Sequence, residues 1–189
     1  GLACSSYITD NDDTFPSHYY GVAESYHAAE GWGGYGGLFG GKLPRFLNPY
    51  FGVTACYPTM ADYNSLLVFK CPSDKGLEAA EYAAIMPTMW SYNGSSYWYN
   101  AEGYTWGGVS LHCRRATTIK NPSTLVLCGD SSGVMTYYAG NPMRRGYWHN
   151  RAEYGWGTTL FVDNHVRLLH ITNDKPNKYN GDGWTFIAK

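Results

Sequence analysis

The sequence predicts an α+β fold, in which the end of a helix precedes an antiparallel sheet with long loops rich in glycine and aromatic residues. Aromatic residues make up 17% of the chain, with 18 Tyr and 7 Trp, and there are 23 Gly. This composition favours pleated strands and ordered loops over long helices. In addition, short β-rich runs bounded by turn residues recur through the C-terminal half.

The first residues predict the helical part of the fold. Leu2, Tyr7 and Ile8 have the spacing of the last turns of an amphipathic helix, which ends before the turn-forming run at residues 10–13 (DNDD). Because the chain begins within this helix, we expect the natural protein to continue upstream of Gly1. The sequence contains no run of 18 apolar residues.

Five β-rich runs predict the strands. They are residues 66–71 (LLVFKC), 96–99 (SYWY), 124–128 (TLVLC), 158–162 (TTLFV) and 165–171 (HVRLLHI). Asp163 and Asn164 stand between the last two runs and predict a two-residue hairpin turn, since Asn tolerates the left-handed backbone conformation. A short helix is predicted over residues 77–84. The C-terminal half is therefore predicted to be an antiparallel meander.

Length and charge limit the classes of protein that this chain can be. The 189 residues fit a single domain, residues 1–189. A net charge of -1, with only 15% charged residues, gives no basic footprint for nucleic acid or for an anionic membrane surface. We therefore exclude both as partners of this domain.

Residues 31–41 (GWGGYGGLFGG) hold seven glycines interleaved with bulky rings. A flexible linker normally carries Ser between its glycines, so an ordered loop held by aromatic packing is predicted. A phosphate-binding loop would need a strand before it and a helix after it, and the sequence predicts neither there.

The cysteines do not form a recognisable metal motif, because no C-x-x-C pair occurs. The five residues are Cys4, Cys56, Cys71, Cys113 and Cys128. They would allow up to two disulfides in an exported protein or would all be buried thiols in a cytosolic one. If bridges form, we expect Cys56 to pair with Cys71.

Five ordered blocks carry a resemblance to a known family. They are residues 1–16 (GLACSSYITDNDDTFP), 69–74 (FKCPSD), 96–100 (SYWYN), 119–130 (IKNPSTLVLCGD) and 149–166, which closes with FVDNHV. The chain resembles bacterial prepilin-type proteins with a processing-associated "H-X9-DG" C-terminal region, found among pilin-like and type II secretion pseudopilin-like sequences. It departs from them in two ways: more than nine residues separate His149 from Asp163, and Asn164 replaces the family's glycine.

The resemblance implies a pilin fold, with a long N-terminal helix packed on a four-stranded antiparallel sheet. It implies a non-enzymatic structural subunit of a type II secretion or type IV pilus-like assembly, anchored in the inner membrane with its head in the periplasm or outside the cell. The implied partners are other pilin-like subunits, bound through the helix upstream of this chain, and no cofactor is implied.

Several residues are candidate metal ligands. His149, Asp163 and His165 could form a three-ligand site if the hairpin brings them together. Asp in tight turns usually bonds the neighbouring backbone, however, and we favour that role for Asp163. A Ca²⁺ site would need several oxygen ligands. Asp130, Asn164, Asp174 and Asp182 could supply them, but these residues do not have EF-hand spacing.

The sequence predicts no enzyme. Neither a G-x-S-x-G nor an H-E-x-x-H motif is present. Of the possible thiol nucleophiles Cys71, Cys113 and Cys128, only Cys113 has an adjacent histidine, His112, and neighbouring side chains on a strand point apart. Paired carboxylates for glycoside hydrolysis stay open, since their separation is spatial.

An extracellular carbohydrate- or peptide-binding module is the alternative, with a glycan or a secreted protein as its partner. It rests on the aromatic side chains at Tyr19, Tyr20, Trp32, Tyr35, 97–99, Tyr147, Trp148 and Trp156. In residues 97–99 we expect Tyr97 and Tyr99 to share one face of a strand and Trp98 to take the other. This alternative predicts a contiguous exposed aromatic patch of several hundred Å².

Overall fold

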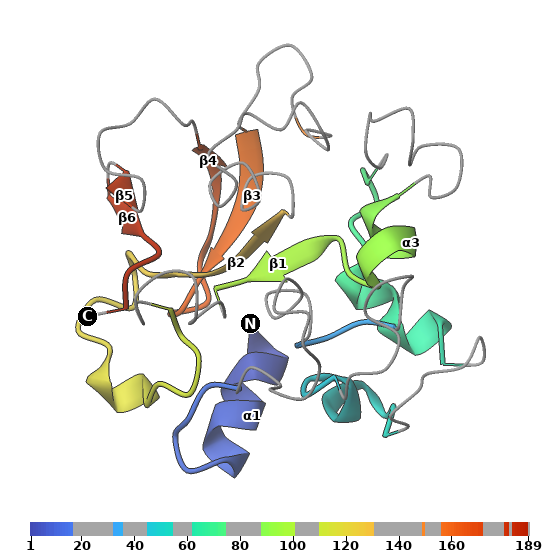
Figure 1. Ribbon diagram of the computed structural model, residues 1–189, viewed down its shortest axis with the longest axis horizontal. Helices are drawn as coiled ribbons and strands as arrows, with labels where there is room; N and C mark the ends of the chain where they lie inside the picture. The colour runs from blue at the N-terminus through green and yellow to red at the C-terminus, as the bar shows by residue number, and fades with distance from the viewer. Residues whose placement is uncertain are drawn as a thin grey trace, which may run out of the picture.

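A four-stranded antiparallel sheet forms the centre of the fold (Figure 1). The computed structural model describes residues 1–16, 32–35, 45–54, 62–74, 88–100, 110–130, 149, 156–171, 180–181 and 183–188. The strands are β1 (Tyr97–Tyr99), β2 (Val126–Asp130), β3 (Trp156–Phe161) and β4 (Val166–His170), and each pairs with the next in the chain. Together with a few short helices, this sheet confirms the predicted α+β class.

Helix α1 (Leu2–Asp10) starts beside the sheet and runs away from it (Figure 1). It confirms the predicted helix, and its buried Cys4 packs into the core together with Tyr7 and Ile8. The chain then turns through Asp12 and Asp13, whose φ angles are 51° and 60°. Short polar side chains tolerate this left-handed conformation, which ends the helix.

The prediction of a strand at residues 66–71 is wrong. The chain there forms the 3-10 helix η3 (Asn64–Phe69). In a 3-10 helix residues three apart lie on the same side, and this places Leu66 and Phe69 in the core while Leu67 and Val68 face outward. The other short helices are η2 (Asn48–Phe51), α3 (Met89–Asn93) and η4 (Ala116–Thr118).

The sheet separates two buried clusters. Trp98, Phe161 and Leu169 lie on one face with Trp184 of the small β5 (Asn180–Gly181) and β6 (Trp184–Thr185) pair. Tyr99 lies in the other cluster, on the side of α1. Alternation along the strands causes this division, and it confirms the expected opposite orientation of Trp98 and Tyr99.

The turn between β3 and β4 has Asn164 in the left-handed conformation, with φ 72°. Asn164 N donates to Phe161 O at 2.9 Å, and Phe161 N donates to His165 O at 2.9 Å. The conformation of Asn164 confirms the prediction, but the turn covers residues 162–164 and is thus one residue longer than expected.

Part of the glycine-rich segment is described, and aromatic packing holds it. Trp32 is buried, and its ring packs against Phe15 and Tyr99. The side chain of Asn48 bonds both backbone groups of Gly34, at 2.9 and 2.7 Å. The other residues of 31–41 and the predicted helix at 77–84 lie outside the described residues.

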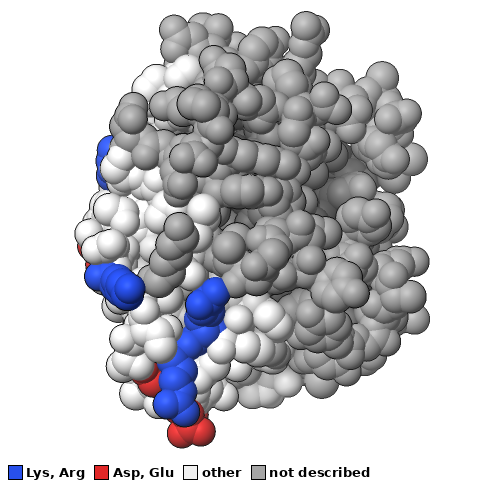
Figure 2. Space-filling view, turned by 60° about the vertical axis from the view of Figure 1, so that its left-hand side comes forward, with Lys and Arg blue, Asp and Glu red and all other residues white. Residues whose placement is uncertain are grey.

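In Figure 2 most of the described surface is uncharged, with a few Lys and Arg side chains and some Asp and Glu close to them. This distribution agrees with the low charge of the sequence. Among the described residues, no helix combines the length and hydropathy needed to cross a membrane.

Candidate functional site

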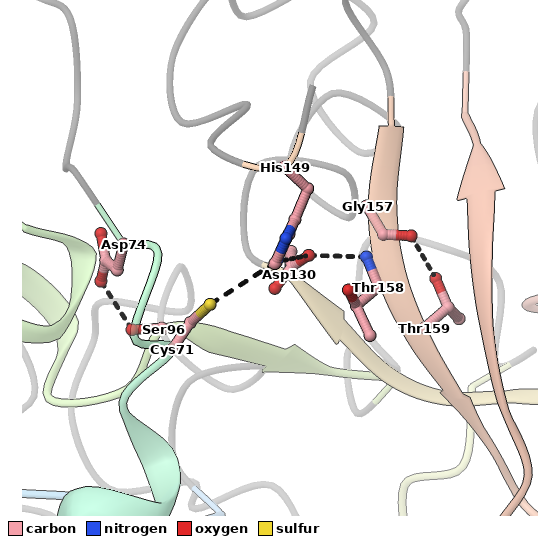
Figure 3. A network of polar contacts seen from close by, with 8 residues as sticks. All are labelled: Cys71, Asp74, Ser96, Asp130, His149, Gly157, Thr158 and Thr159. Atoms are coloured by element: carbon pink, nitrogen blue, oxygen red, sulfur yellow. Dashed lines mark hydrogen bonds and ion pairs between the residues drawn. The ribbon is translucent and has the colours of Figure 1, made fainter. Parts of the chain in front are cut away.

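Three side chains with metal-binding chemistry, Cys71, Asp130 and His149, converge at one end of the sheet (Figure 3). His149 Nε2 lies 3.5 Å from Cys71 Sγ and 3.2 Å from Asp130 Oδ2. The three ligand atoms all lie within 4.8 Å of one another. Cys71 and Asp130 are buried, and the His149 side chain is 26% exposed.

The end of η3 positions Cys71. Ser96 N donates to Phe69 O at 2.9 Å, which ties the end of this helix to the start of β1. Asp74 N donates to Cys71 O at 3.0 Å and closes a turn around the cysteine. Cys71 carries a buried thiol that is not part of a disulfide, so the expected Cys56–Cys71 bridge is wrong. Cys56 itself lies outside the described residues.

Asp130 is the last residue of β2, and its register partner on β1 is Tyr97. Its side chain is 1% exposed, and Thr158 N on β3 donates to Oδ2 at 2.6 Å. Oδ1 is buried and has no hydrogen-bond partner in the part of the chain that the structure describes. Burial raises the pKa of Asp130 to about 6, although the Thr158 hydrogen bond and His149 act in the opposite direction.

Tyr97 borders the same cluster. Burial, followed by the neighbouring Cys71 and Asp130, raises the pKa of the Tyr97 phenol. Its hydroxyl therefore stays protonated at neutral pH and acts there as a neutral hydrogen-bonding group.

The structure divides the metal ligands predicted from sequence. It brings His149 and Asp130 together but leaves Asp163 and His165 in the β3–β4 turn, at the other end of β3. Asp163 accepts a hydrogen bond from His165 N at 3.2 Å, which is the backbone role that we favoured. The pKa of Asp163 is lowered, mainly by the hydrogen bond from the His165 side chain.

The proposed Ca²⁺ ligands are not gathered either, as far as the described residues go. Asp130 lies with a thiol and an imidazole, and Asn164 binds Ser5 through its amide. Asp174 and Asp182 lie outside the described residues.

Sequence reasoning missed Cys71 as a ligand. It lies 78 residues from His149 in the chain, and no local spacing connects the two. The only sequence signal was its place in the FKCPSD block, which did not indicate what the thiol contacts.

The cluster does not have the geometry of a cysteine nucleophile with a histidine base. In such a relay the thiol and the carboxylate bind opposite nitrogens of the imidazole. Here Cys71 and Asp130 both contact Nε2 of His149, so the carboxylate competes with the thiol instead of orienting the ring.

The neighbours His112 and Cys113 form a second cysteine–histidine pair, whose geometry differs from the sequence prediction. Cys113 has a φ of 51° in a turn, not a strand, and its Sγ lies 3.8 Å from Nδ1 of His112. The prediction that these neighbours point apart is therefore wrong. Burial raises the pKa of Cys113, whereas a nucleophilic thiol requires a lowered one.

An apolar groove of about 480 Å³ lies between the start of α1 and the sheet. Its wall includes Leu2 of α1, Val68 of η3, Tyr97 of β1, Leu160 of β3 and Val166 of β4. The groove thus follows the sheet face on which α1 begins.

The aromatic side chains of the described residues mainly fill the interior. Trp32, Trp98 and Tyr99 are buried, and Tyr35, Tyr97 and Trp156 are partly buried. The exposed aromatic patch expected for a carbohydrate- or peptide-binding module is thus absent from the described part of the surface. Tyr19, Tyr20, Tyr147 and Trp148 lie outside that part.

Comparison with protein-family models, with curated proteins and with solved structures finds no match for this chain.

Proposed function

We propose that this chain is the head of a pilin-like subunit, a structural component of a type II secretion or type IV pilus-like assembly. Five sequence blocks in the family's order support the proposal. The succession of a helix and a four-stranded antiparallel sheet is compatible with it. The observation that carries it is the apolar groove that extends along the sheet from the start of α1.

The apolar side chains around this groove are unusually exposed. Leu2 is 83% exposed, Val68 56% and Val166 59%, and all three line the groove. Leu168 is 54% exposed and, two residues beyond Val166, lies on the same face of β4. An exposed apolar surface of this kind is typical of an interaction site.

A helix that continues α1 in the N-terminal direction fits this surface. Each Val or Leu side chain that it covers would contribute about 1.5–3 kcal/mol relative to full exposure. In a pilin-like subunit this helix anchors the protein in the inner membrane and binds the other subunits, while the head lies on the outer side. This function needs neither a cofactor nor catalysis.

The proposal predicts that the double substitution Val166→Asp and Leu168→Asp prevents assembly but leaves the head folded. The isolated chain should keep its melting temperature within a few degrees, because both side chains are exposed. In the full-length protein in its own cells, cross-linked products with other subunits should be lost, since two carboxylates would have to be buried under the helix.

Ser123→Asp is the matched control, because Ser123 is exposed and lies away from the groove residues. It should leave the cross-linked products unchanged. Assembly of the double variant at the level of the wild type would overturn the proposal.

A further inference from the structure

We propose that Cys71, Asp130 and His149 form a zinc site. This inference goes beyond the pilin-like function and does not depend on it. The three residues come from the segment just after η3, the end of β2 and position 149 (Figure 3). A single ion would therefore join parts of the chain that are far apart in sequence.

The two distances from His149 Nε2 to the other ligand atoms fit one tetrahedral zinc ion, and the Cys71 and Asp130 ligand atoms lie within 4.8 Å of each other. With zinc–sulfur and zinc–nitrogen bonds of about 2.3 and 2.05 Å, sulfur and nitrogen are about 3.6 Å apart, and a nitrogen–oxygen pair is about 3.4 Å apart. The corresponding distances here are 3.5 Å from Cys71 Sγ to His149 Nε2 and 3.2 Å from Nε2 to Asp130 Oδ2.

A single proton on His149 Nε2 cannot serve both of its neighbours at once. Nε2 of His149 carries at most one proton, and this proton can be directed to Cys71 Sγ or to Asp130 Oδ2 but not fully to both. The buried Oδ1 of Asp130 has no partner within the described residues. Buried polar atoms are normally satisfied, and a bound cation would stabilise this carboxylate.

The chemistry of the donors selects zinc over the hard cations. A thiolate, an imidazole and one carboxylate are the ligand types that zinc binds in proteins. Ca²⁺ requires six to eight oxygen ligands, and Mg²⁺ requires an octahedral set of oxygens. Three protein ligands leave the fourth zinc position for a water molecule or another donor.

Zinc would act here as a stabilising link. Thr158 N already orients the Asp130 carboxylate, and the turn closed by Asp74 N already orients Cys71. Two of the three ligands are thus held by the fold before the ion binds. Binding to the folded state alone raises the melting temperature in proportion to the free-energy term RT ln(1 + [Zn]/Kd).

The test is a titration of the whole reduced chain with Co²⁺ as a spectroscopic substitute for Zn²⁺. We expect one Co²⁺ per chain, with the absorption of a thiolate-to-cobalt charge transfer, and displacement of this band by one equivalent of Zn²⁺. Cys71→Ser should abolish the band. His149→Ala should weaken zinc binding by more than about 100-fold, because even the loss of a residue that only hydrogen-bonds to a ligand costs about 10–100-fold.

The matched controls are Cys113→Ser, which removes an exposed thiol, and His165→Ala, which removes a histidine of the β3–β4 turn. Both should bind Co²⁺ like the wild type. The site would be disproved if the wild type lacks the charge-transfer band or if Cys71→Ser retains it. Should Cys71→Ser not fold by circular dichroism, unchanged zinc affinity of His149→Ala, whose side chain is partly exposed, would equally disprove it.

Discussion

Asp74 is a buried carboxylate that organises the chain next to the candidate zinc site. It accepts hydrogen bonds from Met89 N at 3.0 Å and Trp90 N at 2.9 Å, in the first turn of α3, and from Ser96 Oγ at 2.6 Å. Negative charge is favourable at the start of a helix, and these bonds satisfy backbone groups that the helix itself cannot. Asp74 therefore has a structural role.

We predict that Asp74→Ala lowers the free energy of unfolding by about 3 kcal/mol, because it leaves buried donors without an acceptor. Urea denaturation of the two proteins measures the difference. Ser73→Ala, at the partly exposed neighbouring position, should change stability by less than about 0.5 kcal/mol. A loss of under about 1 kcal/mol for Asp74→Ala would show that these bonds do not hold α3.

At the scale of elements, the β3–β4 turn determines how the two strands align. The left-handed Asn164 ends the turn, and its side-chain amide donates to Ser5 Oγ of α1 at 3.2 Å. The turn thus connects the sheet to the helix. A glycine at this position would keep the backbone conformation and lose only that contact.

We predict that Asn164→Val is less stable than Asn164→Gly by about 1–2 kcal/mol, since a β-branched residue opposes a positive φ. Both substitutions remove the bond to Ser5, so their difference isolates the backbone effect. Thermal denaturation monitored by circular dichroism provides the comparison. Equal stability of the two variants would mean that the turn relaxes to another conformation.

The elements differed in how well the sequence predicted them. The alternation of β3 and the turn residue Asn164 carry a local signal, and this part of the meander was predicted closely. The strand predicted at residues 66–71 is wrong because a short apolar run has no periodicity that distinguishes a strand from a buried helical turn. There the core contacts of Leu66 and Phe69 stabilise η3.

The candidate zinc site could not be predicted from the sequence for a different reason. The sequence indicates two of its ligands, Asp130 and His149, but for two different sites. For Cys71 the sequence indicates only a disulfide or a nucleophile. Register and loop path bring these residues together, and neither can be derived from residue spacing when the ligands lie 78 residues apart.

At the scale of the whole molecule, the described residues bury the two faces of the sheet to different extents. The face with Trp98 and Phe161 is buried beneath Trp184 and Phe186. On the opposite face, α1 and Trp32 pack beside Tyr99 among the described residues, while the groove carries the exposed Val166 of β4. This asymmetry is what the proposed helix would complete.

The most direct test of the pilin-like account is to place a photo-cross-linking amino acid at position 166 of the full-length protein in its own cells. Mass spectrometry of the products identifies the neighbour of the groove. The account predicts cross-links to an apolar helical segment N-terminal to Gly1, in the same subunit or in an adjacent one. Cross-links only to lipid or to unrelated proteins, or no cross-links at all, would contradict it.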